Sequence, residues 1–327
     1  MEIHYFHRNK NAGFSIHKVF KTIIDEVLKY EKCKDTFLPS PNAGICSILK
    51  NGVYALRQQD TGSINHITGD VHYLTYFLNP KKTVVTVHDI MYYSYLSGIK
   101  KMIWKWLYIK SLKRAAKVTF ISEYAKKQVL DIIKLPERKM AIIPNPVSED
   151  MQYVPKEFDE KKPVVLHIGT LKRKNLARSI LALHNICCHL RIIGKIDQET
   201  IALLEKYKID YSNVYNLSDD DLRKEYEACD IVNFPSTFEG FGMPVIEGQA
   251  IGRVVVTSNI SPMKDICGNG VYLVDPFDVE SIRDGYMTLI TQKELRKQLI
   301  KKGLVNVQNY RVEQIAKQYI NIYQSIR

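Results

Sequence analysis

The stretch FEGFGMPVIE, from Phe238 to Glu247, places two glutamates around a glycine-containing turn. An apolar run over residues 230–235 precedes this turn, and an apolar run that is compatible with a helix follows it. Glycines allow backbone N–H groups to approach a ligand closely, and a helix N-terminus favours anions. Pro244 suits the first helical turn, so Glu247 is expected one turn into the helix and Glu239 before it. The stretch predicts a strand–turn–helix site for an anionic or hydroxyl-rich ligand.

The whole chain alternates short β-branched runs with longer helical patterns, which predicts an α/β fold with parallel sheets. Its 327 residues exceed one ordinary domain and suit two domains of about 150 residues each. The polar stretch over residues 146–163 lacks apolar periodicity and is the best candidate for a linker. Residues 311–326 predict a final helix.

The bulk composition is that of an ordinary globular protein, with 45% hydrophobic and 25% charged residues. No run of 18 apolar residues occurs, so no transmembrane helix is expected. The opening residues 1–7 resemble a first strand rather than a signal peptide. The six cysteines form no CxxC pair and no metal-ligand spacing, which indicates thiols in a reducing compartment. We therefore expect a cytoplasmic protein.

The net charge of +12 is concentrated in the first half of the chain. Residues 1–150 contain 23 lysines and arginines against 13 aspartates and glutamates, whereas residues 151–327 contain 24 against 22. Such a basic first domain suits nucleic acid, a phospholipid surface or a phosphate-bearing substrate. Charge alone does not choose among these three. The sequence contains no nucleic-acid recognition motif, so we do not expect nucleic acid to be the partner.

The pattern from Glu239 to Glu247 resembles the E-x7-E signature of retaining glycosyltransferases of the group-1 (family four) type. The resemblance implies the GT-B architecture, which has two Rossmann-like domains facing a cleft and a C-terminal helix that returns to the first domain. It also implies an acceptor-binding domain over residues 1–148 with the helix at 311–327, and a nucleotide-sugar donor-binding domain over residues 149–310.

A cluster of three cations, Lys172-Arg173-Lys174, follows an apolar strand that ends at Gly169. Cations beside backbone amides suit a diphosphate. In the resembled family, G-T-L-x-x-R-K-N at this place holds the donor diphosphate, although the loop here is one residue shorter. The resemblance assigns these roles in the second domain: Arg173 and Lys174 to the donor diphosphate, Glu239, Phe241 and Gly242 to the donor sugar, and Glu247 to the nucleoside ribose. It makes Glu239 a catalytic residue.

In the first domain, His88-Asp89 follows the apolar strand over residues 83–88. The family has a histidine and an aspartate at this strand end, where the histidine contacts the transferred sugar, so the resemblance makes His88 catalytic and a donor-sugar ligand. Asp89 either caps the next segment or orients His88. Gly13 lies in a loop that the resemblance places near the donor diphosphate.

The run Asp219-Asp220-Asp221 contains a D-x-D pattern, which chelates a divalent ion in glycosyltransferases of the other major fold. Here it follows Ser218 and opens a helix, so Ser218 and Asp221 also fit a capping pair. We favour capping and expect no catalytic metal and no cofactor; the nucleotide-diphosphate sugar is a co-substrate.

Both tryptophans lie in a basic segment over residues 100–117, which predicts a helix with two faces. The face with Trp104, Tyr108, Ser111, Leu112 and Ala115 is expected to be core. The opposite face carries Ile103, Trp106, Lys110, Lys113 and Lys117, with Arg114 beside it. This composition suits peripheral contact with an anionic membrane or with a lipid-linked phosphate acceptor. The alternative is a solvated lysine face with Trp106 packed on a neighbouring loop.

We interpret the chain as a metal-independent, retaining glycosyltransferase of polysaccharide biosynthesis, acting on a glycan or lipid-linked glycan acceptor. We expect the protein in the cytoplasm, where it could also attach peripherally to the inner face of the membrane. Two alternatives stay open. One is a nucleotide-sugar 2-epimerase of the same architecture, and the other is a catalytically silent protein that binds nucleotide-sugar for another transferase.

Overall fold

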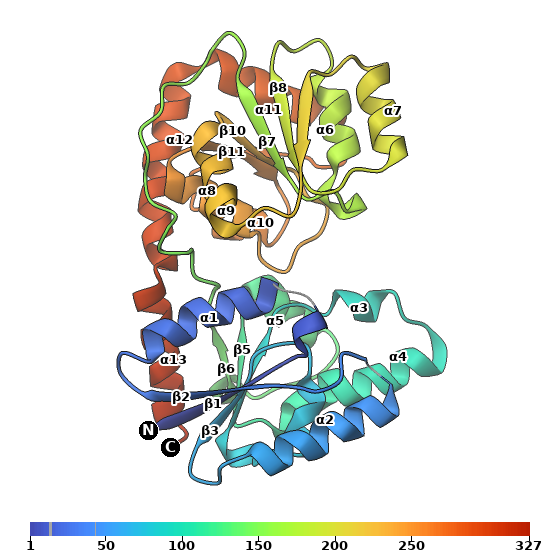
Figure 1. Ribbon diagram of the computed structural model, residues 1–327, viewed down its shortest axis with the longest axis vertical. Helices are drawn as coiled ribbons and strands as arrows, with labels where there is room; N and C mark the ends of the chain where they lie inside the picture. The colour runs from blue at the N-terminus through green and yellow to red at the C-terminus, as the bar shows by residue number, and fades with distance from the viewer. Residues whose placement is uncertain (13–14, 43) are drawn as a thin grey trace. The chain divides into compact units, whose positions relative to one another are not determined.

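The computed structural model describes residues 1–12, 15–42 and 44–327, which form two compact units (Figure 1). The first unit contains Met1–Pro146 together with Val312–Arg327, and the second contains Val147–Arg311. Each unit has a six-stranded sheet whose neighbouring strands are all parallel. This confirms the predicted α/β class with two Rossmann-like domains, and the division between Pro146 and Val147 falls at the start of the predicted linker.

The first unit is built on the sheet order β2-β1-β3-β4-β5-β6. Its strands are β1 (Glu2–His7), β2 (Lys32–Phe37), β3 (Ile64–Ile67), β4 (Thr83–Val87), β5 (Lys117–Phe120) and β6 (Met140–Ile142). Its α-helices are α1 (Ser15–Val27), α2 (Ile45–Gln58), α3 (Met91–Ser94), α4 (Gly98–Trp104), α5 (Glu123–Leu130) and α13 (Val312–Gln324). Short helical turns of other types are η1 (Lys10–Ala12), η2 (His72–Tyr76), η3 (Pro80–Lys82), η4 (Lys105–Ile109), η5 (Lys110–Arg114) and η6 (Glu137–Lys139).

The C-terminal helix α13 belongs to the first unit, where it packs beside α1 (Figure 1). Tyr319 and Tyr323 of α13 are buried among the apolar side chains of α1 and the sheet. The Tyr323 hydroxyl shares a hydrogen bond of 2.7 Å with Nδ1 of His66 on β3. Because these tyrosines are buried and their hydroxyls are hydrogen-bonded, this face of α13 packs in a defined position against the first sheet. The predicted return of the last helix is confirmed.

The second unit has the sheet order β12-β11-β10-β7-β8-β9. Its strands are β7 (Val164–Ile168), β8 (His189–Ile193), β9 (Tyr211–Val214), β10 (Ile231–Phe234), β11 (Val254–Ser258) and β12 (Tyr272–Val274). Its helices are α6 (Leu176–Leu183), α7 (Gln198–Lys206), α8 (Asp219–Ala228), α9 (Met243–Ile251), α10 (Met263–Ile266), α11 (Val279–Thr291) and α12 (Lys293–Asn306), with η7 (Lys172–Lys174) and η8 (Val307–Tyr310). Strands β7 and β10 are neighbours, so the segments that follow them lie at the same edge of the sheet.

One strand of the first sheet was not expected from the sequence. Residues 15–32 predict a single helix, but α1 ends at Val27 and the edge strand β2 begins at Lys32. The β2 sequence, KCKDTF, is polar and largely exposed, because an edge strand needs only one buried neighbour. It therefore lacks the apolar run by which the other strands were found.

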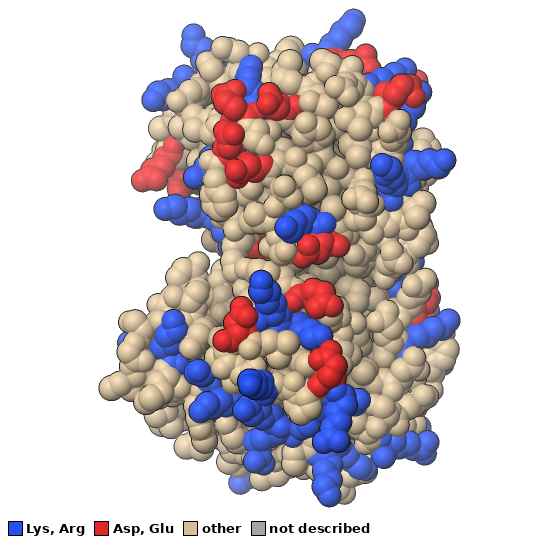
Figure 2. Space-filling model, turned by 180° about the vertical axis from the view of Figure 1, so that it is seen from behind, with Lys and Arg blue, Asp and Glu red and all other residues tan. Residues whose placement is uncertain are grey.

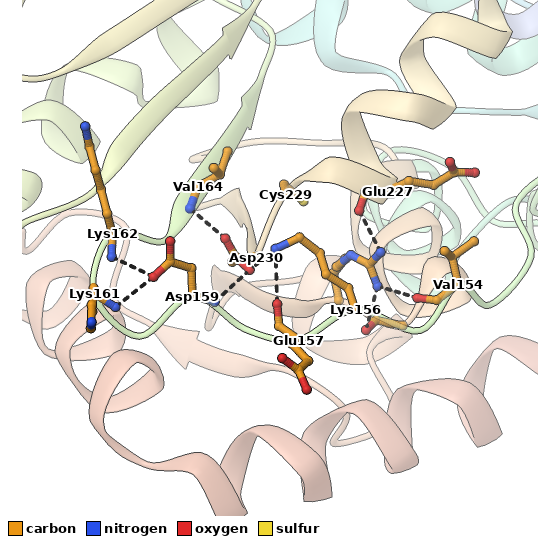
Figure 3. Close-up of polar contacts among 12 residues, drawn as sticks. Val154, Lys156, Glu157, Asp159, Lys161, Lys162, Val164, Glu227, Cys229 and Asp230 are labelled. Carbon is orange, nitrogen blue, oxygen red and sulfur yellow. Dashed lines mark hydrogen bonds and ion pairs between the residues drawn. The ribbon is translucent and has the colours of Figure 1, made fainter.

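The predicted linker runs without helix or strand from residue 147 to 163 and is fixed to the second unit by Asp230 (Figure 3). The buried carboxylate of Asp230 accepts hydrogen bonds from the backbone N–H groups of Asp159 (3.3 Å) and Val164 (2.8 Å), and it pairs with the Lys156 ammonium. Arg253 adds a second anchor, since its guanidinium donates to the carbonyl oxygens of Val154 (2.8 Å) and Glu227 (2.7 Å).

A cavity of about 590 Å³ lies beside these anchors, at the N-terminal ends of β7, β10 and β11. Charged groups of its lining pair with one another, as in Lys156–Asp230 and Arg296–Glu160. We interpret this region as the place where the linker attaches to the second unit. The candidate functional site lies at the opposite, carboxyl ends of the same strands.

We expect Asp230→Ala to lower the free energy of unfolding by about 3 kcal/mol, because it leaves a buried N–H and an ammonium group without their acceptor. Urea denaturation followed by circular dichroism measures the change. The control is Glu157→Gln on the same segment, whose side chain is exposed and whose effect should stay within about 0.5 kcal/mol. Equal effects of the two substitutions would contradict the assignment of Asp230 as the anchor.

Candidate functional site

The turn between β10 and α9 has the predicted strand–turn–helix form. Strand β10 ends at Phe234, and α9 begins at Met243 with Pro244 in its first turn. Gly242 precedes the helix with φ of 117°, a conformation that disfavours side chains, and a Cβ there would approach Ile266 to 3.2 Å. Glycine is therefore required at this position, and it directs the chain from the sheet edge into the helix.

Glu239 lies at the centre of this turn, where it joins the two motifs that the sequence singled out. One carboxylate oxygen, Oε1, is 2.9 Å from Nη1 of Arg173 and 2.8 Å from Nζ of Lys174. The Glu239 side chain is only 11% exposed, so the two ion pairs are partly shielded from water. Arg173 and Lys174, which lie 66 and 65 positions before Glu239 in the chain, thus form one cluster with it, which we call the Glu239 triad.

Lys174 is the more buried of the two cations in the Glu239 triad, because its side chain is 15% exposed against 29% for Arg173. Its ammonium lies 4.5 Å from the centre of the Phe234 ring, which adds a cation–π contact. Burial lowers the pKa of Lys174, while the Glu239 carboxylate opposes this shift by favouring the charged form. Gly169, with φ of 90°, leaves room for this side chain, because a Cβ there would lie 3.0 Å from Lys174 Cγ.

Backbone contacts hold the basic loop η7 against the β10–α9 turn. The Thr237 N–H donates to the Arg173 carbonyl oxygen at 2.8 Å. Asn175, in a left-handed conformation directly after the cations, donates its amide to the carbonyl oxygens of Pro235 (2.9 Å) and Pro276 (2.6 Å). These bonds fix the cations relative to the glutamate, so the charge arrangement is set before any ligand binds.

Glu247 occupies the predicted place one turn into α9, and its partner is a residue that the sequence did not reveal. The Tyr226 hydroxyl of α8 donates a hydrogen bond of 2.5 Å to Oε2 of Glu247. Tyr226 is fully buried, and burial raises its pKa well above the usual range, so it acts as a donor. The only signal in the sequence is a single aromatic residue in an otherwise charged helix, DDDLRKEYEA.

Phe241 is a core residue at this site. Its side chain is 3% exposed, and its ring meets Tyr310 edge-on at 5.8 Å between centroids. Any contact of Phe241 or Gly242 with a ligand would therefore come from their backbone groups. The predicted role of this pair in holding a sugar stays a prediction in that form.

The aspartates at residues 219–221 cap a helix, as the sequence reasoning favoured. Ser218 Oγ accepts a hydrogen bond from the Asp221 N–H at 3.1 Å and donates to its carboxylate at 2.6 Å. Asp220 pairs with Arg223 (2.6 Å) and Lys224 (2.7 Å). Within the described ranges of the chain, no group of three or more histidine, cysteine, aspartate or glutamate side chains is arranged to hold a metal ion.

His88 follows β4 at the carboxyl edge of the first sheet. Its Nε2 donates to the Thr68 carbonyl oxygen at 2.9 Å, and burial lowers its pKa to about 4. The imidazole is therefore neutral at pH 7, with Nδ1 as an acceptor. Asp89 caps the following turn through a bond from the Met91 N–H (2.9 Å), so the carbonyl of Thr68, and not Asp89, orients His88. Gly13 lies outside the described residues.

The basic aromatic segment departs from the predicted single helix. Helix α4 ends at Trp104, a π-helical turn (η4) and a 3₁₀ turn (η5) follow, and Lys117 belongs to strand β5. The placement of Lys117 on the outer helical face is therefore wrong; its ammonium donates to the Arg138 carbonyl oxygen at 2.8 Å. The predicted core face is confirmed, because Tyr108, Ser111, Leu112 and Ala115 are buried and Trp104 is partly buried.

The remaining outer-face residues are exposed, including Trp106 (54%), Lys110, Lys113 and Arg114. Trp106 also stacks on the Tyr76 ring at 5.0 Å, and Arg114 lies over the same ring at 5.4 Å. Trp106 is thus packed on a neighbouring turn while part of it stays open to solvent, and contact with a membrane stays a prediction. None of the helices in the described parts of the chain combines the length and apolar character needed to cross a bilayer.

Two family models match consecutive parts of the chain. Residues 150–304 match the glycosyl transferases group 1, and residues 64–151 match glycosyltransferase family 4. Among curated relatives, the chain is 24% identical over 237 residues to O-antigen chain mannosyltransferase B of Escherichia coli, covering 65% of this chain and 62% of that protein. It is 26% identical over 212 residues to O-antigen chain mannosyltransferase RfbU of Salmonella typhimurium, covering 62% and 59%. The match thus spans about three fifths of these relatives.

Solved structures show the same fold. Sucrose-phosphate synthase from Thermosynechococcus elongatus aligns with a TM-score of 0.83 at 16% identity, covering 100% of this chain and 99% of that one. Anabaena HepE, in complex with UDP-glucose, aligns with a TM-score of 0.77 at 14% identity, covering 99% and 100%. The GT-B fold implied by the E-x7-E resemblance is confirmed by these structures.

Proposed function

We propose, from the premise that the chain is a group-1 glycosyltransferase, that it transfers a sugar from a nucleotide-diphosphate donor to a glycan or lipid-linked glycan with retention and without a metal ion. The observation that carries this proposal is the Glu239 triad, in which Arg173 and Lys174 lie within 2.9 Å of one carboxylate oxygen. The O-antigen names of two relatives support a glycan acceptor and a place in polysaccharide biosynthesis.

The two cations of the Glu239 triad would receive the donor diphosphate. Negative charge develops on the leaving diphosphate in the transition state, and preorganised cations stabilise it without reorganising at that moment. Arg173 offers a fork of N–H donors and Lys174 a compact ammonium, which together suit two phosphate groups. These fixed charges would take the part that a divalent ion plays in other transferases.

The acids would bind the rest of the donor. Glu247 has its carboxylate held by Tyr226, which suits it to accept hydrogen bonds from the two ribose hydroxyls. Glu239, with the backbone at residues 241–242, would hold the sugar hydroxyls. With neutral His88 as a further sugar ligand, we favour front-face attack in which the departing phosphate removes the acceptor proton.

We expect Glu239→Gln to reduce kcat at least about 100-fold, because the amide loses the charge that positions the sugar against the cations. The variant should still fold because the amide fills the same space, but its thermal midpoint should fall, since the two cations lose their anion. Sugar transfer from a panel of UDP- and GDP-sugars to glycan acceptors gives the rate. The control is Glu199→Gln, an exposed acid on α7 whose rate should match the unmodified protein.

A Glu239→Gln variant that is folded and fully active would contradict the assignment. Product analysis without acceptor separates the two alternatives. Conversion of the donor to its 2-epimer would indicate an epimerase, and donor binding with no product under any condition would indicate a silent binding protein.

We also propose that the first unit contacts an anionic membrane through Trp106 and the exposed cations Lys110, Lys113 and Arg114. Basic side chains gather on the face of the first unit seen in Figure 2, in line with the excess of cations in residues 1–150. Exposed apolar side chains precede them on the same segment, at Ile99 (71%) and Met102 (65%). Cations beside exposed apolar groups are the composition of an interfacial surface.

In flotation with vesicles that contain anionic lipid, we expect Lys110→Gln with Lys113→Gln to lose most binding at low salt, because each nearby cation contributes about 1 kcal/mol. The charge-matched control replaces the exposed pair Lys301 and Lys302 of the second unit with glutamine and should bind like the unmodified protein. Equal losses in the two double variants would show that only net charge matters, and no binding at low salt would refute membrane contact.

A further inference from the structure

A second cavity, of about 370 Å³, lies in the first unit at the carboxyl ends of its strands. Arg8 follows β1, Asp70 follows β3 and Asp89 follows β4, and all three line this cavity. Ligands of open α/β sheets bind at this edge, and the volume falls within the range of small-molecule sites. The cavity therefore has the position and size of a binding site, and none of the roles assigned above uses it.

Aromatic side chains form one wall of the cavity. Trp104 stacks on Tyr108 with 4.8 Å between ring centroids and an angle of 8°. Tyr92 lies 6.1 Å from Trp104 and is 58% exposed, so its ring is open to a ligand. The Trp104–Tyr108 pair is fixed by packing against the core, since the Tyr108 side chain is only 6% exposed. A rigid aromatic wall of this kind offers apolar contact to the C–H face of a sugar ring.

Polar groups face the aromatic wall. Arg8 and Asp70 form a loose pair, with 3.5 Å between Nη1 and Oδ1, and the Asp70 side chain is 61% exposed. Asp89 adds a second carboxylate, one of whose oxygens accepts the Met91 N–H. Carboxylates and a guanidinium accept and donate hydrogen bonds to neighbouring hydroxyls. Since two acids accompany one cation, the charged lining is net negative and disfavours an anionic ligand.

We propose that this cavity binds the uncharged terminal hexose of the acceptor, stacked on Tyr92 and Trp104 and hydrogen-bonded to Asp70 and Asp89. This proposal rests on the proposed function, which supplies a glycan as acceptor. It adds that the terminal sugar of that glycan carries no charge. The basic surface around Lys110 and the acidic cavity then have separate tasks: the surface attracts phosphate or anionic lipid, while the cavity selects a neutral sugar. His88 directly precedes Asp89 in the chain, which places the bound sugar beside the residue expected at the reaction centre.

The two tryptophans provide a direct assay of this cavity. Trp106→Phe leaves Trp104, in the cavity wall, as the single tryptophan of the chain. In this background we expect methyl hexosides to change the fluorescence saturably, with Kd on the order of 1–10 mM, as befits a few hydrogen bonds and one stacking contact. Glucuronate and hexose 6-phosphates should bind roughly tenfold more weakly.

Substitutions separate the cavity from the surrounding surface. Tyr92→Ala should weaken hexoside binding at least about tenfold, whereas Tyr95→Ala, an exposed tyrosine on the same segment and outside the lining, should leave it unchanged. Asp70→Asn should reduce the preference for neutral over anionic sugars. No saturable change with any hexoside up to about 100 mM, tighter binding of the anionic sugars, or equal losses in the two tyrosine variants would overturn the proposal.

Nucleoside diphosphate binding, measured by thermal shift on the same variants, keeps this test apart from the proposed function. Hexoside binding that depends on Tyr92 without any nucleotide binding would support the cavity and refute the donor site. Nucleotide binding with no hexoside signal would refute the cavity alone.

Discussion

The shared carboxylate of Glu239 is the constraint on which the rest of the site depends. Arg173 and Lys174 both lie within 3 Å of the same Glu239 oxygen. At so short a separation the two cations would repel each other unless an anion lay between them. Glu239 is that anion, and the glycines at 169 and 242 give the chain the turns and room that bring the three groups together. Two cations and one anion leave the triad with a net charge of +1, so under our proposal a diphosphate would be attracted to it and would join it with little rearrangement of the protein.

The two units divide the chemistry by charge. The second unit is nearly neutral overall and has three consecutive cations in the loop η7, whereas the first unit is strongly basic yet contains an acidic, aromatic cavity at its strand ends. Under our proposals, a neutral sugar and an anionic carrier would be recognised by different surfaces of the first unit. The long linker needs its own anchor, which the buried Asp230 supplies at the end of the second sheet away from the triad.

Sequence reasoning predicted what depends on local pattern: the alternating elements, the turn at Gly242 and the capping of α8 by Ser218. The return of α13 to the first unit came instead from the family resemblance. Sequence reasoning could not predict Tyr226 as the partner of Glu247, because that contact joins helices α8 and α9 and leaves only one aromatic letter in a charged run. It also overextended α1 and the helix expected over residues 100–117, because no local signal marks where they end. Neither the end of α1 before the polar edge strand β2 nor the π turn after Trp104 is marked by a proline or glycine.

We propose that the fixed cations Arg173 and Lys174 take the place of a metal ion in binding a nucleotide diphosphate. Calorimetric titration of UDP and GDP in the presence of EDTA tests it most directly, with the matching monophosphates for comparison. We expect saturable binding of one diphosphate without any divalent ion, tighter than that of its monophosphate and weakened at least about tenfold by Lys174→Gln. Binding that appears only after Mg²⁺ or Mn²⁺ is added would contradict the account.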